Sequence, residues 1–298
     1  MTRRTLAAPD WVRALRPAVR RVELLGARDG IAHVVGVRAA GAGPGDGPLV
    51  FKRYDDGRGP HAARAMRAVG RALRAGNDAA LAVPAVHRWH AGAGVLVQAA
   101  VPGRALLPLL GTRRRHRALV QAAGALAALH TSGARVGPDT TMTDHVAELI
   151  HPRPDVVAGA VPALGPRIRA VATALRRWQA AAPPVAAVPI HRDAHPRQMT
   201  LDGPRVWLVD WDLAACGDAA LDVANFALYL RTRLDHDGDG ASAAFLDAYC
   251  ARGVDVADRL DAFTACMALR LVCKTWRLRP PGWQARMAAL LTLAERAV

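Results

Sequence analysis

Two aspartates lie on either side of a predicted β-hairpin, in a stretch that reads HRDAHPRQMTLDGPRVWLVDWD from His191 to Asp212. Asp193 comes before the hairpin and Asp210 ends the apolar run VWLV, where a carboxylate is costly unless it is paired or bound to a cation. Gln198 adds an amide oxygen between the two acids. Each aspartate alone also fits a loop cap or a turn former. Together, two carboxylates and an amide oxygen favour a hard cation such as Mg2+.

Lys52 is a second candidate for chemistry. Only two of the 40 Lys and Arg residues are lysines, so a retained lysine is informative. Lys52 lies in the apolar run LVFKRY, which predicts a strand. A compact ammonium reaches a phosphate where a planar guanidinium does not fit. The alternative is a surface charge on an edge strand, and the residue alone does not decide between the two.

His191 and His195 are spaced four residues apart, which could indicate a pair of transition-metal ligands. Pro196 follows His195 directly, and it disfavours the helix that would place both rings on one face. We therefore expect no transition-metal site here.

The first hundred residues are predicted to form most of a small sheet. Short β-type runs at 21–27 and 31–40 flank Arg28-Asp29-Gly30, which is a hairpin signal. A third strand is expected at 49–55 and a helix at 59–76, with Pro60 in its first turn and Gly76 at its end. Two more strands are expected at 83–92 and 94–101. The expected order is β-β-β-α-β-β, and Pro102-Gly103 ends it.

The rest of the chain is predicted to be mostly helical. Apolar spacing near 3.6 indicates helices at 115–133 and 167–182, and a proline-containing segment at 151–166 separates them. The tail from Ala220 onward is also helical. We therefore predict an α+β fold with two lobes: a five-stranded antiparallel lobe with one helix at residues 1–101, and a larger helical lobe at residues 102–298.

The formal net charge is +15, and it is unevenly spread. Residues 1–180 hold 27 Lys and Arg against 11 Asp and Glu, whereas residues 181–298 hold 13 against 14. A solvated arginine-rich surface explains this charge, and no aromatic residues interleave it as in single-strand nucleic-acid binders. The four cysteines lack metal-ligand spacing, and free thiols are typical of cytoplasmic proteins. The sequence has no long apolar run. We therefore predict a cytoplasmic protein with no membrane or nucleic-acid partner. Monomer and homodimer both stay open.

These segments resemble the aminoglycoside phosphotransferase and choline kinase-like family, which has a protein-kinase-like fold. HRDAHPRQMTL resembles the family's catalytic loop, usually His-Gly-Asp followed by Asn, and LVDWDLAACGDAALDVANFA resembles its metal-binding segment. VFKRY resembles the strand of the nucleotide lysine, LVQAAVPGRAL the hinge, and GALAALH the helix that commonly ends in Leu-His. The matches follow the family's order over nearly the whole chain.

The resemblance implies a role for individual residues. Asp193 would orient or deprotonate the acceptor hydroxyl, Asp210 and Gln198 would bind Mg2+, and Lys52 would hold the α- and β-phosphates of ATP or GTP. Phosphoryl transfer needs mainly positioning and charge neutralisation, so one such carboxylate suffices. Further nucleotide contacts would come from the hinge and from the hairpin at 27–30: Gln98, Ala99, Ala100, Gly26 and Gly30. Supporting residues would be His191, Arg192, Asp212 and Asp222, and Asp222 would brace the loop.

The sequence departs from the family pattern at two places. Gln198 stands where Asn is usual, with the same ligand oxygen on a longer stem. The predicted helix at 59–76 contains no acid, although kinase-like lobes usually pair the strand lysine with a helix Glu. Lys52 is therefore expected to pair with Asp55, Asp56 or the phosphates. The missing acid leaves one alternative function, a catalytically impaired partner protein that binds a nucleotide or a peptide.

The expected acceptor is a hydroxyl on a small molecule, natural product or peptide. A polycationic antibiotic needs a pocket lined by carboxylates. The helical lobe has acidic residues that are expected mainly in solvated positions: Asp235, Asp237, Asp239, Asp255, Asp258 and Asp261. Because the rest of the chain is basic, a neutral or acidic acceptor is favoured.

Overall fold

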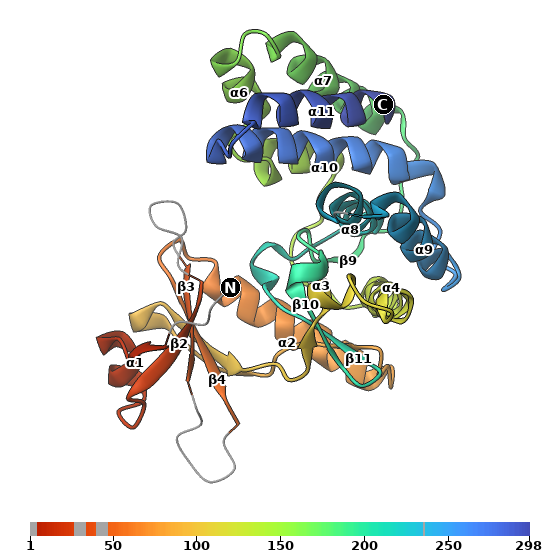
Figure 1. Ribbon diagram of the computed structural model, residues 1–298. Helices are drawn as coiled ribbons and strands as arrows, with labels where there is room; N and C mark the ends of the chain where they lie inside the picture. The colour runs from red at the N-terminus through yellow and green to blue at the C-terminus, as the bar shows by residue number, and fades with distance from the viewer. Residues whose placement is uncertain (1–4, 27–33, 40–46, 235) are drawn as a thin grey trace.

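The computed structural model describes residues 5–26, 34–39, 47–234 and 236–298. Its N-terminal part is an antiparallel six-stranded sheet in the order β1-β2-β3-β4-β7-β6. The strands are β1 (Thr5–Ala7), β2 (Arg21–Gly26), β3 (Val34–Ala39), β4 (Leu49–Tyr54), β6 (Val86–His90) and β7 (Val95–Ala99). Figure 1 shows this sheet at one end of the molecule and a stack of helices at the other.

The sheet has one strand more than the sequence predicted, and this lobe has a second helix. The additional elements are β1 and the helix α1 (Asp10–Leu15). The run TLA is too short to show strand alternation, and α1 has only one fully buried side chain, Val12, so neither element has a clear sequence pattern. The other five strands agree with the prediction. The predicted turn at Arg28-Asp29-Gly30 lies outside the described residues.

Lys52 lies in an interior strand, because β4 pairs with β3 on one side and with β7 on the other. Side chains of a strand alternate between its two faces. Phe51 is buried in a small core beneath one face, together with Val12 and Val97. Lys52 and Tyr54 therefore share the opposite face, which is directed toward the helical lobe.

Helix α2 (Gly59–Ala75) covers that face of the sheet. It begins with Pro60 in its first turn and ends at Gly76, as the sequence predicts. Met66, Val69 and Leu73 face the core at helical spacing. A polar contact helps to attach the helix to the helical lobe: His61 Nε2 lies 2.7 Å from the carbonyl oxygen of Ala214. The position of α2 is thus fixed without any acidic side chain.

Within the described residues, the helical lobe packs six long helices and the seven-residue α6 around one large core. They are α4 (Arg115–Thr131), α6 (Pro154–Ala160), α7 (Gly165–Ala181), α8 (Ala220–Arg233), α9 (Gly238–Cys250), α10 (Ala257–Leu278) and α11 (Trp283–Arg296). A short helix, α3 (Leu106–Leu109), precedes α4, and two more short segments, α5 (Met142–Asp144) and η2 (His145–Leu149), lie between α4 and α6. In Figure 1, α7, α10 and α11 stack together farthest from the sheet. Helix α6 was not predicted, because Pro154, which we interpreted as part of a proline-rich spacer, occupies its first turn.

The predicted hairpin between the two acids is present as β10 (Met199–Asp202) and β11 (Arg205–Leu208). Short pairings with β5 (Leu81–Ala82) and β8 (Arg104–Ala105) extend it to four strands. Strand β9 (Val188–Ile190), which precedes the hairpin in the sequence, pairs with β12 (Ala215–Gly217), which follows it. These pairings hold both ends of the stretch, so they fix the positions of Asp193 and Asp210. Within the described residues, no helix is long and apolar enough to cross a membrane.

Candidate active site

The loop after β9 carries His191, Arg192 and Asp193 and is held from below by Asp222. The Asp222 carboxylate is fully buried on α8, and it accepts the backbone N–H of His191 at 2.6 Å and that of Arg192 at 2.8 Å. Its second support is His130, whose Nε2 lies 3.3 Å away. Burial opposes ionisation of Asp222, but these hydrogen bonds outweigh it and lower the pKa of the carboxyl.

The loop has a strained residue next to its acid. Arg192 adopts a positive φ of 64°, a conformation that favours glycine. In the family that the sequence resembles, glycine usually stands at this position. Neighbouring contacts stabilise this conformation: the ring of His191 packs edge-on against Trp211 at 4.9 Å, and His191 Nε2 lies 3.0 Å from the carbonyl oxygen of Val209.

Asp193 is partly exposed and is held by a residue that the sequence did not indicate. Arg270 of α10 places one guanidinium nitrogen 3.0 Å from Asp193 Oδ1 and another 3.1 Å from the carbonyl oxygen of Arg192. The second carboxylate oxygen of Asp193 lies 3.8 Å from His195 Nε2. Arg270 follows Asp193 by 77 positions in the sequence (270 − 193), so no local pattern could have identified it. It leaves Asp193 oriented and open to solvent.

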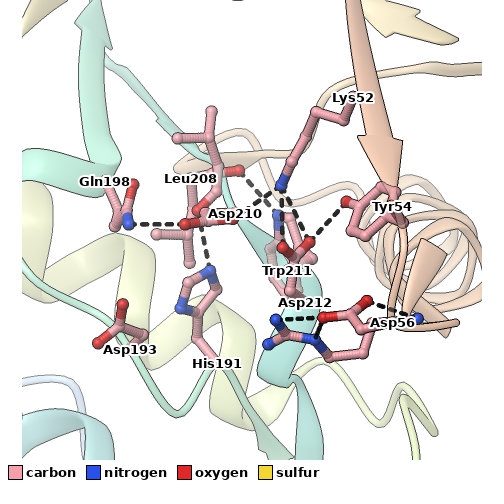
Figure 2. Close-up of polar contacts among 12 residues, drawn as sticks. Lys52, Tyr54, Asp56, His191, Asp193, Gln198, Leu208, Asp210, Trp211 and Asp212 are labelled. Carbon is pink, nitrogen blue, oxygen red and sulfur yellow. Dashed lines mark hydrogen bonds and ion pairs between the residues drawn. The ribbon is translucent and has the colours of Figure 1, made fainter. Parts of the chain in front are cut away.

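Asp210 follows β11 and turns back toward Gln198 and Lys52. Its backbone is left-handed, with a φ of 73°. Gln198 Nε2 donates to Asp210 Oδ2 at 3.0 Å, and Lys52 Nζ lies 2.8 Å from Asp210 Oδ1. Figure 2 shows these groups facing one another, with Asp193 standing apart on the other side of Gln198 and His191. The two acids of the stretch thus face different parts of the site.

Lys52 has two acidic partners, and neither is the one we predicted. Its ammonium contacts Asp210 and both carboxylate oxygens of Asp212, at 3.0 and 3.1 Å. Asp55 lies instead 3.7 Å from Arg53, and Asp56 pairs with Arg58. The prediction of Asp55 or Asp56 was wrong, because both follow the end of β4 whereas Lys52 points from its interior; pairing with the nucleotide phosphates stays a prediction. The missing helix acid therefore does not leave the lysine unpaired.

Tyr54 is a further member of the site that the sequence analysis missed. Its hydroxyl donates to Asp212 Oδ1 at 2.7 Å, and the Lys52 ammonium lies 5.2 Å from the centre of its ring. Strand alternation was an available signal, because residues two apart in a strand share a face.

The pKa shifts of Lys52, Asp210 and Asp212 indicate that these three side chains together have too little positive charge. Burial disfavours the ammonium of Lys52, but Asp210 and Asp212 outweigh it and raise the pKa of Lys52. Burial likewise opposes the charge on Asp210, yet Lys52 holds the pKa of Asp210 below its usual range. Burial raises the pKa of Asp212, and the charge of Asp210 adds to the effect. A second cation would let both carboxylates ionise.

The residues fit Mg2+ as that second cation. Asp210 and Gln198 lie side by side, and a half-turn of the amide exchanges its nitrogen and oxygen, so the oxygen can face the same space. Carboxylate and amide oxygens, completed by substrate phosphates and water, suit Mg2+. Among the residues described, no group of three or more His, Cys, Asp and Glu is placed to hold a metal. The ring of His195 stacks on Tyr229, and the ring of His191 packs against Trp211.

The residues implied for nucleotide binding lie mainly along β7. Gln98 is buried, and the N–H groups of Ala99 and Ala100 donate to the carbonyl oxygens of Ala85 and Pro48, both at 2.8 Å. Contacts with a base in this segment would therefore use carbonyl groups or displace these bonds. Gly26 ends β2 beside a register shift in the β2–β3 pairing. Gly30 lies outside the described residues.

Comparisons with known proteins show what the chain is similar to. The model of the phosphotransferase enzyme family matches residues 37–263. No curated protein matches the chain. Among solved structures, a thermostable mutant of aminoglycoside phosphotransferase APH(4)-Ia is 15% identical with a TM-score of 0.70, over 97% of this chain and 98% of that one.

Two further structures show the same fold. A choline/ethanolamine kinase family protein from Mesorhizobium loti is 18% identical with a TM-score of 0.62, over 95% of this chain and 90% of that one. Choline kinase LicA from Streptococcus pneumoniae is 14% identical with a TM-score of 0.64, over 96% of both chains. At these identities the likeness shows the kinase-like α+β fold alone.

Proposed function

The chain belongs to the phosphotransferase enzyme family, and from that membership we propose that it is an ATP-dependent kinase that phosphorylates a hydroxyl group. The acceptor is a small molecule, a natural product or a peptide. The observation that carries the proposal is the joint placement of Lys52, Asp210 and Gln198 on one side of the hairpin and of Asp193 on the other. Structures of similar fold contain ADP with hygromycin B in one case and GDP with kanamycin in another, so both ATP and GTP are candidate donors.

Each residue has a distinct task in the proposed reaction. Lys52 neutralises charge on the nucleotide phosphates, and Asp210 with Gln198 holds Mg2+, which would supply further neutralisation. Asp193 accepts a hydrogen bond from the acceptor hydroxyl and takes its proton as the acceptor oxygen bonds to the γ-phosphorus of ATP and the bond from that phosphorus to the leaving oxygen of ADP breaks. Arg270 keeps the Asp193 carboxylate oriented for that contact. All four cysteines are free thiols, which suits a cytoplasmic enzyme.

We also propose that the acceptor is neutral or acidic rather than polycationic. Several acids of the helical lobe are already engaged: Asp237 pairs with Arg115 and Asp239 with Arg231, both at 2.9 Å, and Asp255 accepts the N–H of Ala257. Asp235 lies outside the described residues. These partners reduce the negative charge that the three residues can offer a cationic antibiotic. Saturable phosphorylation of kanamycin at rates near ~1 s−1 or above would contradict this preference.

The proposal is tested with purified protein, ATP and Mg2+. We expect Mg2+-dependent thermal stabilisation by ATP, and ADP release that increases with a hydroxyl acceptor. Asp193→Asn should lower transfer by roughly 10²–10⁴-fold, as expected for loss of a general base, while nucleotide binding persists. The matched control is Asp247→Asn, at an exposed acid of α9. A protein that shows neither stabilisation nor an effect of Asp193→Asn is not this kinase.

A further inference from the structure

One face of helix α8 holds the loop that carries Asp193. The side-chain amide of Asn225 donates to the carbonyl oxygen of Ala194 at 2.8 Å. The ring of Tyr229 stacks on the ring of His195, with centroids 5.1 Å apart and an interplanar angle of 27°. The two α8 residues are four positions apart, so they share a helix face. The position of the His195 ring is therefore set by the same helix that holds the backbone next to Asp193.

The two ring nitrogens of His195 differ in their protonation. Nδ1 accepts the backbone N–H of Arg197 at 3.2 Å, so this nitrogen carries no proton. Burial lowers the pKa of His195 to about 4, so the ring is neutral near neutral pH. A neutral imidazole has one N–H group, which must then be at Nε2. The ring therefore offers a hydrogen-bond donor at Nε2 and carries no positive charge.

This donor lies close to Asp193, at a separation too wide for a direct hydrogen bond. Nε2 of His195 is 3.8 Å from Oδ2 of Asp193, whereas N–H···O bonds have lengths of about 2.7–3.2 Å. The other carboxylate oxygen, Oδ1, is held by Arg270 at 3.0 Å. Both side chains are partly open, with exposed fractions of 16% for His195 and 25% for Asp193. Because the separation is less than two hydrogen-bond lengths, one oxygen atom can lie within hydrogen-bonding distance of both groups.

We propose that His195 contacts the acceptor: its Nε2–H donates to the oxygen of the reacting hydroxyl, while that hydroxyl donates its hydrogen to Asp193 Oδ2. The acceptor oxygen keeps one lone pair, which faces the γ-phosphorus of the nucleotide. As this lone pair bonds to phosphorus, the proton passes to Asp193 and the bond from phosphorus to the ADP oxygen breaks. His195 keeps its own proton and orients the oxygen, and such positioning is the main need of phosphoryl transfer. The proposal rests on the proposed function and adds a substrate-contacting residue to it.

Two substitutions separate this role from the part that the ring plays in holding the backbone. His195→Asn keeps an oxygen that can accept the N–H of Arg197 but has no donor as far out as Nε2. His195→Gln places an amide N–H group at about that distance and lacks the nearer acceptor. Water serves as the acceptor, so the measured rate is ATP hydrolysis at saturating Mg2+.

We expect His195→Asn to lower kcat by about 10-fold, with an unchanged KM for ATP and an unchanged Tm. His195→Gln should have a lower Tm and yet a higher kcat than His195→Asn. The control is His87→Asn, at an exposed histidine of β6, and it should match the wild type. Equal losses of kcat in the two His195 variants, or a larger loss in His195→Gln, would show that the ring only holds the backbone and would overturn the proposal.

The variant Asp193→Asn distinguishes failure of this proposal from failure of the proposed function. If Asp193→Asn leaves ATP hydrolysis unchanged, the proposed function fails. If Asp193→Asn lowers hydrolysis and His195→Asn does not, the role of His195 alone fails.

The position of the ring proton is tested without turnover. In protein with isotope-labelled histidine, NMR distinguishes a protonated ring nitrogen from an unprotonated one, and the signals that vanish in His195→Asn identify the ring. We expect a proton on Nε2 and none on Nδ1 near neutral pH. A proton on Nδ1 would contradict the proposal, since Nε2 would then have no hydrogen to donate.

Discussion

The Lys52 ammonium contacts both carboxylate oxygens of Asp212, at 3.0 and 3.1 Å, and the Tyr54 hydroxyl donates to the same carboxylate at 2.7 Å. Lys52 also contacts Asp210, which is the candidate metal ligand. When Asp210 binds a metal ion, its hold on the lysine weakens. We therefore expect Asp212 to keep Lys52 in the site, in place of the acid that α2 lacks.

Asp212→Asn should lower kcat/KM for ATP by about 10–100-fold, because a hydrogen bond to a charged group contributes about 1.5–3 kcal/mol. The pKa of Lys52 should also fall, since one of the two carboxylates that raise it is removed. The amine of Lys52 should then react faster with an acylating reagent at a fixed alkaline pH, as measured by mass spectrometry. Asp55→Asn is the control, because Asp55 is exposed and its one ion pair within the described residues is with Arg53. Unchanged lysine reactivity in Asp212→Asn would refute this role.

Gln198→Ala should raise the Mg2+ concentration needed for half-maximal activity by roughly 10-fold, the effect of losing about 1.4 kcal/mol of binding. The reason is that the amide supplies one of two protein oxygens in the proposed metal site. The measurement is the rate of ADP formation against free Mg2+ at saturating ATP. If the maximal rate falls while the Mg2+ dependence stays the same, Gln198 serves only to hold Asp210.

The sequence predicted the parts of the site that depend on local pattern. The hairpin between Asp193 and Asp210 follows from the turn residues Asp202-Gly203 and two apolar runs, and it is present, although both strands are shorter than the runs and Asp202 ends β10. The strand that contains Lys52 was likewise predicted from its apolar neighbours, whereas its interior position in the sheet was left open and comes from its pairing with β3 and β7. Family resemblance added Asp222, which indeed contacts the loop.

The unpredicted parts depend on contacts between distant segments or on short elements. Asp212 meets Lys52 across 160 residues, and Arg270 reaches Asp193 from α10, so no local spacing encodes either contact. Strand β1 has three residues, too few to show a period. Its place at the edge of the sheet comes from pairing with β2, which is a tertiary contact.

Asp222→Asn should destabilise the fold and loosen the catalytic loop. The Asp222 carboxylate accepts two backbone N–H groups. The side-chain amide of the Asn variant has only one oxygen, so its NH2 group faces one of these N–H groups and buried donors are left without an acceptor. Each such loss costs about 1–3 kcal/mol. Urea denaturation should show a lower midpoint with an unchanged slope, and Asp247→Asn, at an exposed acid of α9, should show neither. An unchanged midpoint for Asp222→Asn would mean that the loop is held by its other contacts.

Stability should fall on mild acidification because of His145. Burial, with the nearby charge of Arg192, lowers the pKa of His145 to about 3. The unfolded state protonates this ring near pH 6.5, so between pH 6.5 and 3 the unfolded state binds more protons. The stability contributed by His145 is therefore complete above pH 6.5 and is lost as the pH falls through this window.

The expected loss between pH 6.5 and 5 is about 1.5–2 kcal/mol, from the linkage between proton binding and unfolding. Urea midpoints of the wild type should decline over this range, and His145→Gln should flatten the decline even if it lowers stability overall. His87→Gln, at an exposed histidine of β6, should retain the wild-type slope. Because the comparison uses slopes against pH rather than absolute stability, a general packing defect in His145→Gln cannot mimic the result. An equal slope in all three proteins would show that the ring is protonated in the folded state.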